Sequence, residues 1–74
     1  MQPDEYHPSL SWEAEYEIVL ALKETYPTVD LDMVGIEQLY QWIIMLPNFD
    51  DDPMLVNDGI LNDILREWYE EVNP

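Results

Sequence analysis

Apolar residues recur at helical spacing in three separate stretches of the chain. The most regular stretch follows Asn57, a residue type that caps helix N-termini well. Its apolar positions form one stripe: Ile60, Leu61, Ile64, Leu65, Trp68 and Tyr69. This pattern predicts a helix that begins near Asn57 and turns a single face to a core.

A second stretch begins near Ser11, another good N-cap residue, and ends at Tyr26. Pro27 ends it because proline steers the residue before it out of the helical region. One face of this predicted helix carries Ala14, Ile18, Ala21, Leu22 and Tyr26. The opposite face carries Glu13, Glu17 and Glu24, with Leu20 among them. The helix is therefore predicted to keep an acidic side in solvent.

The third stretch, residues 36–46, is shorter and has a broader apolar surface. Its stripe consists of Ile36, Leu39, Tyr40, Ile43 and Leu46. Trp42 and Ile44 lie off that stripe, so this helix is either buried on two sides or shows apolar surface to a partner. Segments 28–35 and 54–56 contain β-branched valines and could pair as a minimal extended wing.

Together these elements predict a mainly α, small three-helix domain that covers residues 9–74. Residues 1–8 hold two prolines and no apolar periodicity, so we expect a mobile N-terminal extension there. A chain of 74 residues leaves no room for a second domain. It contains no cysteine, so its stability must come from the 47% of residues that are hydrophobic.

The charge balance limits the classes of partner. Seventeen acidic residues against two basic ones give a formal net charge of −15. Nucleic-acid backbones and anionic membrane surfaces would repel such a chain, so neither is an expected partner. Metal cations and basic protein surfaces would attract it. With no signal-peptide pattern and no membrane-span pattern, a cytoplasmic location is expected.

The sequence contains few candidate catalytic residues. There is no cysteine nucleophile, and the one histidine, His7, lies in the predicted extension. Gly35 and Gly59 stand alone, so no phosphate-binding glycine pattern is present. The chain is not expected to be an enzyme.

The run Asp50-Asp51-Asp52 is the densest group of carboxylates. Carboxylate oxygens suit hard cations and bind Fe²⁺ more weakly. Consecutive residues point in different directions, so the three cannot all chelate one ion. Two interpretations remain: a solvated loop that caps or flanks the third helix, or weak iron binding helped by Glu13, Glu17 and Glu24.

Two apolar features near this run also allow two interpretations each. Trp12 either covers the end of the helical bundle or is presented to a partner. The run Met54-Leu55-Val56 is either buried beneath the helices or exposed as an apolar surface that can contact other proteins.

Read together, these residues resemble one known family. The resemblance extends without gaps from Leu10 to Trp68, and its most specific part is Phe49-Asp50-Asp51-Asp52-Pro53, six residues after Gln41-Trp42-Ile43. It is also carried by Trp12, Tyr26-Pro27, Val29-Asp30, Asn57, Ile60-Leu61, Ile64-Leu65 and Trp68. On these residues the chain is similar to the IscX (YfhJ) proteins, which accompany bacterial iron–sulphur cluster assembly.

The resemblance implies more than the periodicity does. It implies a modified winged-helix fold and an accessory protein that binds the cysteine desulfurase IscS through its basic surface, in competition with frataxin. It also implies weak binding of Fe²⁺ or Fe³⁺, no tightly bound cofactor and modulation of cluster formation. We expect a monomer. The expected iron ligands are Glu17, Asp30, Asp50, Asp51 and Asp52. The expected partner-binding residues are these five together with Trp12, Glu13 and Glu24.

Two other functions fit the same charge. The chain could be an iron donor or storage protein, which requires strong Fe²⁺ binding of defined stoichiometry. It could also be an acidic nucleic-acid mimic that occupies the basic groove of a DNA-binding protein, in which case DNA would compete for that groove.

Overall fold

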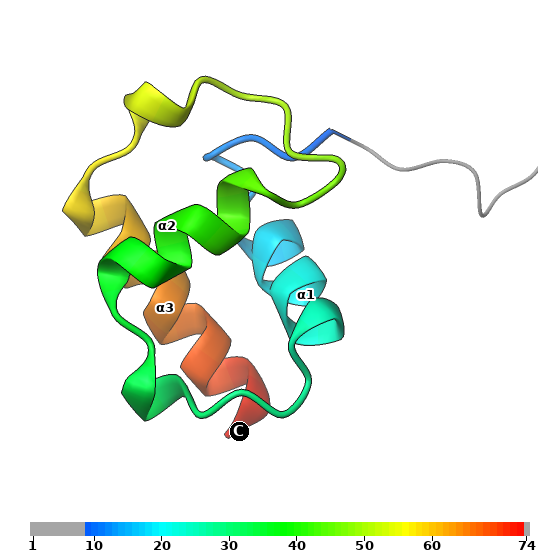
Figure 1. Cartoon of the computed structure of the whole chain (residues 1–74), viewed down its shortest axis with the longest axis vertical. Helices are drawn as coiled ribbons and strands as arrows, with labels where there is room; N and C mark the ends of the chain where they lie inside the picture. The colour runs from blue at the N-terminus through cyan, green and yellow to red at the C-terminus, as the bar shows by residue number, and fades with distance from the viewer. Residues whose placement is uncertain (1–8, 74) are drawn as a thin grey trace, which may run out of the picture.

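The computed structural model describes residues 9–73, so the predicted mobile extension, residues 1–8, lies outside the described residues. Three helices form the domain: α1 (Glu15–Thr25), α2 (Ile36–Ile44) and α3 (Asp58–Val72). Each connection between them contains a short 3₁₀ turn, Leu31–Met33 in the first and Pro53–Leu55 in the second. The helix α3 packs against both others and most extensively against α1 (Figure 1). The predicted mainly α, three-helix domain is confirmed.

One hydrophobic core joins the helices and their connections. Its members are Leu10, Trp12, Ile18, Val19, Leu22, Leu31, Val34, Leu39, Ile43, Leu46, Leu61, Ile64 and Trp68. Trp42 is half-buried and packs beside this core, with its ring stacked on Tyr26 at 4.2 Å between centroids and edge-on to Trp68 at 6.4 Å. These aromatic contacts favour the interpretation that α2 is covered on two sides.

The helix predicted to begin near Asn57 is confirmed, with one correction. The Asn57 side chain accepts a hydrogen bond from the Ile60 N–H at 2.9 Å, as an N-cap does. Trp68 is buried, but Tyr69 is 45% exposed and does not belong to the core stripe. It lies about 100° further around the helix than Trp68, which takes it past the edge of the buried face.

The start of α1 differs from the prediction. The helix begins at Glu15 rather than near Ser11, and Ala14 occupies the N-cap without a side-chain hydrogen bond. The reason lies in the preceding backbone, which pairs with a distant segment. The Leu10 N–H donates to the Asn48 carbonyl, and the Asp50 N–H donates to the Leu10 carbonyl, both at 2.9 Å. Directly after this pairing, residues 11–14 form a turn in which the Ala14 N–H donates to the Ser11 carbonyl at 3.0 Å, and the helix follows that turn. The end of α1 at Thr25, before Pro27, agrees with the prediction.

The predicted wing is wrong. Segments 28–35 and 54–56 each contribute to a 3₁₀ turn, and the two turns lie at opposite ends of the molecule (Figure 1). Aspartate side chains bend the chain at both places: Asp30 Oδ1 accepts from the Asp32 N–H, and Asp52 Oδ1 from the Met54 N–H. Within residues 9–73 the one bridge between extended residues joins Leu10 and Phe49. The modified winged helix stays a prediction of the resemblance.

Among the described helices, none combines the length and the apolar character needed to cross a membrane.

Candidate partner-docking site

The acidic loop, residues 50–52, is held against the N-terminal segment by hydrogen bonds from Trp12. The backbone N–H of Trp12 donates to Asp51 Oδ2 at 3.0 Å, and its indole Nε1–H donates to the Asp52 carbonyl at 2.8 Å. The Tyr40 hydroxyl donates to the Pro53 carbonyl at 3.3 Å and holds the next residue of the loop. Contacts from two distant parts of the chain therefore fix the loop backbone.

The Trp12 side chain itself is buried and packs against two other aromatic rings. It is 4% exposed, and its ring lies edge-on to Phe49 at 4.9 Å and parallel to Tyr40 at 6.3 Å between centroids. Burial favours the interpretation that Trp12 covers the end of the bundle rather than being presented to a partner. Its expected partner-binding role is thereby corrected, because a buried ring acts on a partner only through the loop that it positions.

The three aspartates of the acidic loop have different surroundings. Asp51 is partly buried, and both of its carboxylate oxygens accept backbone hydrogen bonds, from Trp12 and from the Asp52 N–H at 2.7 Å. Asp52 is exposed and caps the 3₁₀ turn Pro53–Leu55 through one oxygen. Asp50 is exposed as well. Asp51 is therefore a structural residue, whereas Asp50 and Asp52 present negative charge to solvent.

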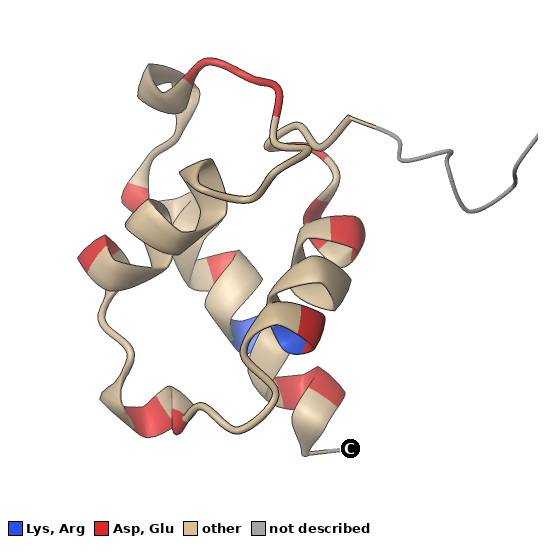
Figure 2. Ribbon diagram, turned by 45° about the vertical axis from the view of Figure 1, so that its right-hand side comes forward, with Lys and Arg blue, Asp and Glu red and all other residues tan. Residues whose placement is uncertain are grey.

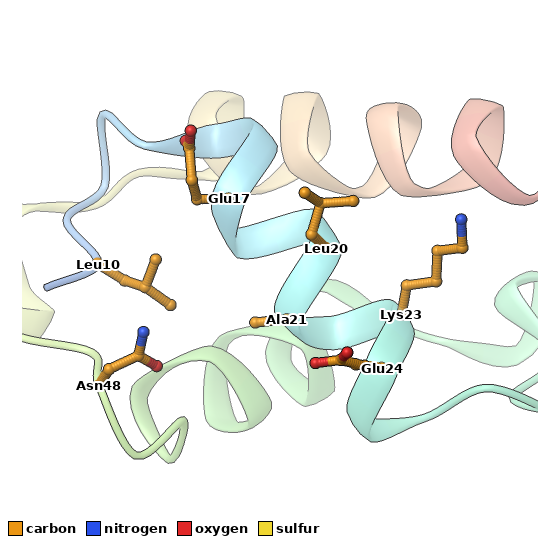
Figure 3. Close-up of a pocket in the computed structure, with 7 residues that line it drawn as sticks. All are labelled: Leu10, Glu17, Leu20, Ala21, Lys23, Glu24 and Asn48. Carbon is orange, nitrogen blue, oxygen red and sulfur yellow. The ribbon is translucent and has the colours of Figure 1, made fainter. Parts of the chain in front are cut away.

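A groove runs between α1 and the loop that precedes the acidic residues (Figure 3). Its volume is about 570 Å³. The groove is lined by Leu10, Glu17, Leu20, Ala21, Lys23, Glu24 and Asn48. Leu10 and Ala21 point toward one another across it, while Glu17 lies at one end and Glu24 at the other (Figure 3). Leu20, 39% exposed, also lines the groove and lies between Glu17 and Lys23 along α1 (Figure 3).

Positive charge on this chain is already neutralised within the domain. The chain's one lysine, Lys23, pairs with Glu71 at 3.5 Å, and its one arginine, Arg66, pairs with Asp63 at 2.8 Å. No charged side chain of residues 9–73 is buried. Within residues 9–73, the acidic positions are spread over the helices and the connections, whereas the two basic positions lie near one another on α1 and α3 (Figure 2).

The structure brings most of the predicted partner-binding residues to one side. Asn48 and Leu10 line the α1 groove together with Glu17 and Glu24. The two segments that pair at Leu10 and Asn48 continue into Trp12 and Asp50. We call the exposed carboxylates of this side the acidic face: Glu13, Glu17, Glu24, Asp50 and Asp52. Asp30 is separate, because it caps the 3₁₀ turn at the opposite end of the molecule (Figure 1).

The predicted iron ligands do not form a ready-made metal site. In the part of the chain that the structure describes, no three histidine, aspartate or glutamate side chains are gathered so that they could hold a metal ion. Asp51 uses both oxygens on backbone N–H groups, and Asp30 is remote from the acidic loop. Weak iron binding at the surface stays a prediction.

The hydrogen bonds that hold the acidic loop could not be found from the sequence. Trp12 and its partners in the loop are 39 and 40 residues apart. A single sequence has no local pattern that links residues at such a separation. The sequence draws attention to Trp12 and to the aspartates of the acidic loop separately, but it does not indicate that they are in contact.

Residues 10–73 match the family described as iron–sulphur cluster assembly. The chain belongs to that family. The matched range contains all three helices, the acidic loop and the α1 groove. The chain is also similar to an uncharacterized protein of Pseudomonas aeruginosa, PA3808, with 38% identity over 63 residues that cover 85% of this chain and 96% of the relative. The resemblance to the IscX family is thus confirmed.

Proposed function

We propose that this IscX-family protein is an acidic accessory factor that docks on the basic surface of an IscS-type cysteine desulfurase. It would modulate cluster formation in the cytoplasm as a monomer, in competition with frataxin and without catalysis of its own. Family membership supports the role in cluster assembly. The observation that carries the docking proposal is the acidic face, whose carboxylates are exposed. Lys23 lines the α1 groove but is paired with Glu71, and Arg66 is paired with Asp63.

Electrostatics would supply much of the attraction. An acidic face raises the rate of encounter with a basic surface and favours one orientation over others. Each exposed ion pair contributes only about 0.2–1 kcal/mol, so several pairs are needed for useful affinity. The acidic face offers five carboxylates on two connected segments, α1 with its approach and the acidic loop. Salt should weaken docking, because exposed charges are screened within about 10 Å at 0.1 M ionic strength.

Iron would associate with the same exposed carboxylates, and weakly. Oxygen ligands that are not gathered into a cluster hold Fe²⁺ poorly compared with a built site. If both ligands use the acidic face, Fe²⁺ and the desulfurase should each reduce the affinity of the other. Titration of the complex with Fe²⁺ would show this as a reciprocal change in the two dissociation constants.

The test is a calorimetric titration of two matched double variants into a purified IscS-type desulfurase. Asp50→Asn/Asp52→Asn removes two charges from the acidic face, and Asp30→Asn/Asp32→Asn removes two charges from the opposite end. Asparagine keeps an oxygen at Asp52 and at Asp30, so both 3₁₀ turns retain their cap. Asp51 is left intact because its two oxygens hold the backbone.

We expect the first variant to bind roughly threefold to thirtyfold more weakly, with a shallower dependence on salt. The second should bind like the wild type. Equal weakening by both variants would show an effect of net charge alone. Unchanged binding by the first variant would contradict the assignment of the acidic face.

A further inference from the structure

Two apolar side chains stand out from the surface beside the acidic loop. Met54 is 83% exposed and Leu55 is 65% exposed, both on the 3₁₀ turn Pro53–Leu55. Single exposed apolar residues are common on protein surfaces. Here two large ones are adjacent, and none of the three residues of the turn is buried. We call Met54 and Leu55 the apolar pair.

The backbone beneath the apolar pair is fixed on both sides. On the N-terminal side Asp52 caps the turn through the Met54 N–H, and its carbonyl accepts from the Leu55 N–H at 3.0 Å and from the Trp12 indole. On the C-terminal side Val56 packs against the core and Asn57 caps α3. A contact made by an ordered backbone loses less entropy on binding than one made by a mobile loop.

Negative charge surrounds the apolar pair. Asp50 and Asp52 precede it and Asp58 follows it, all exposed. A shallow groove of about 480 Å³ begins beside the turn and includes Glu37 and Asp58 among its lining residues. Both cations of the chain are held in ion pairs elsewhere. A surface that covers the pair must therefore tolerate carboxylates around it, which favours lysine and arginine there.

We propose that the apolar pair inserts into an apolar pocket on the basic protein surface that binds the acidic face. This inference rests on the proposed function and adds a second component to it. An apolar centre with a charged rim is the usual composition of a protein interface. Methionine suits such a contact because its flexible side chain adapts to an irregular pocket. Met54 and Leu55 would give affinity that salt does not remove, while Asp50 and Asp52 set the orientation.

The experiment compares the apolar pair with a matched methionine. Met33 is 81% exposed and lies on the other 3₁₀ turn, which also has an aspartate cap. Met54→Ser/Leu55→Ser, Met54→Ser alone and Met33→Ser would be titrated into the desulfurase at several salt concentrations and temperatures. Circular dichroism and thermal unfolding would show whether each full-length variant is folded, and exposed positions should tolerate serine.

We expect the double variant to bind at least tenfold more weakly than the wild type, with an unchanged slope of log Kd against log salt. Its heat-capacity change on binding should be less negative, because less apolar surface is buried. Met54→Ser should give part of this loss, and Met33→Ser should bind like the wild type.

Three results would overturn the inference, and each is distinguishable. If the double variant binds like the wild type while Asp50→Asn/Asp52→Asn binds weakly, docking is electrostatic and only the proposed function stands. If the wild type fails to bind at any salt concentration, the proposed function falls and the inference falls with it. If sedimentation shows a wild-type dimer that the double variant dissociates, the apolar pair contacts a second copy of this chain.

Discussion

The two 3₁₀ turns have the same kind of cap but are anchored in opposite ways. In both, an aspartate oxygen accepts from the N–H two residues later, at 3.1 Å in the Leu31–Met33 turn and 3.0 Å in the Pro53–Leu55 turn. Both also present a methionine to solvent. They differ in their leucines: Leu31 is 8% exposed and belongs to the core, whereas Leu55 is 65% exposed.

This difference shows two ways to fix a connection in a small domain. The Leu31–Met33 turn is anchored by one of its own apolar side chains. The Pro53–Leu55 turn is anchored through its approach, because Trp12 and Tyr40 bind the backbone carbonyls of Asp52 and Pro53. Because these neighbouring residues hold the Pro53–Leu55 turn, its own apolar residues, Met54 and Leu55, stay exposed at the surface. The first turn therefore buries a side chain in the core, and the second leaves Met54 and Leu55 exposed.

Replacing the two leucines should give the largest contrast. Leu31→Ala is expected to lower the free energy of unfolding by about 2–3 kcal/mol, because it removes buried methyl groups and leaves a cavity. Leu55→Ala should change it by less than about 0.5 kcal/mol, since the side chain is exposed. Urea unfolding of the two variants measures both values. Similar losses in the two variants would contradict the proposed difference in anchoring.

Removing the indole N–H should loosen the second turn selectively. Trp12→Phe keeps an aromatic ring in the core but removes one of the two donors to the Asp52 carbonyl, leaving the Leu55 N–H, at a cost of about 1 kcal/mol. Amide hydrogen exchange should accelerate at Met54 and Leu55 and stay unchanged at Met33, beyond the global loss of stability. Equal acceleration of exchange at both turns would mean that Trp12 stabilises the whole fold and does not anchor the second turn in particular.

Loss of the caps should affect the two turns to a similar degree. Asp52→Ala and Asp30→Ala each remove one side-chain acceptor at the surface, and each should cost about 0.5–1 kcal/mol. The corresponding asparagine variants should stay within a few tenths of a kcal/mol of the wild type. Thermal unfolding of the four variants tests this. A large loss in either asparagine variant would show that charge, rather than the capping oxygen, holds that turn.

The smallest effect is expected from the Tyr40 hydroxyl. Its bond to the Pro53 carbonyl is long, at 3.3 Å, and lies at the exposed surface, so water can replace it. Tyr40→Phe should lower stability by no more than about 0.5 kcal/mol. A loss above about 1 kcal/mol in urea unfolding would make Tyr40, and not Trp12, the main anchor of the second turn.

The parts of the fold that were predicted correctly depend on local chemistry. Asn57 and the stripe after it define the start and the buried face of α3, and Pro27 defines the end of α1. The start of α1 was mispredicted because Ser11 is a suitable cap locally, while the pairing of Leu10 with residues 48–50 decides its conformation. The wing was mispredicted because valine content suggested strands where aspartate caps form turns.

In the candidate site, too, the sequence predicts what depends on local residue chemistry and misses what depends on contacts between distant residues. Composition alone indicated metal cations or a basic protein surface as partners, and Glu13, Glu17 and Glu24 are exposed as expected. The sequence could not show that Asp51 is occupied by backbone N–H groups, nor that Trp12 is buried beneath the loop. It also could not separate Asp30 from the acidic face, because that separation depends on how the connections are folded.

The acidic face is tested most directly by the salt dependence of desulfurase binding for the two matched charge variants. The slope of log Kd against log salt should be shallower for Asp50→Asn/Asp52→Asn than for the wild type. It should be unchanged for Asp30→Asn/Asp32→Asn. Identical slopes for both variants, or a shallower slope only when the opposite end is changed, would contradict docking through the acidic face.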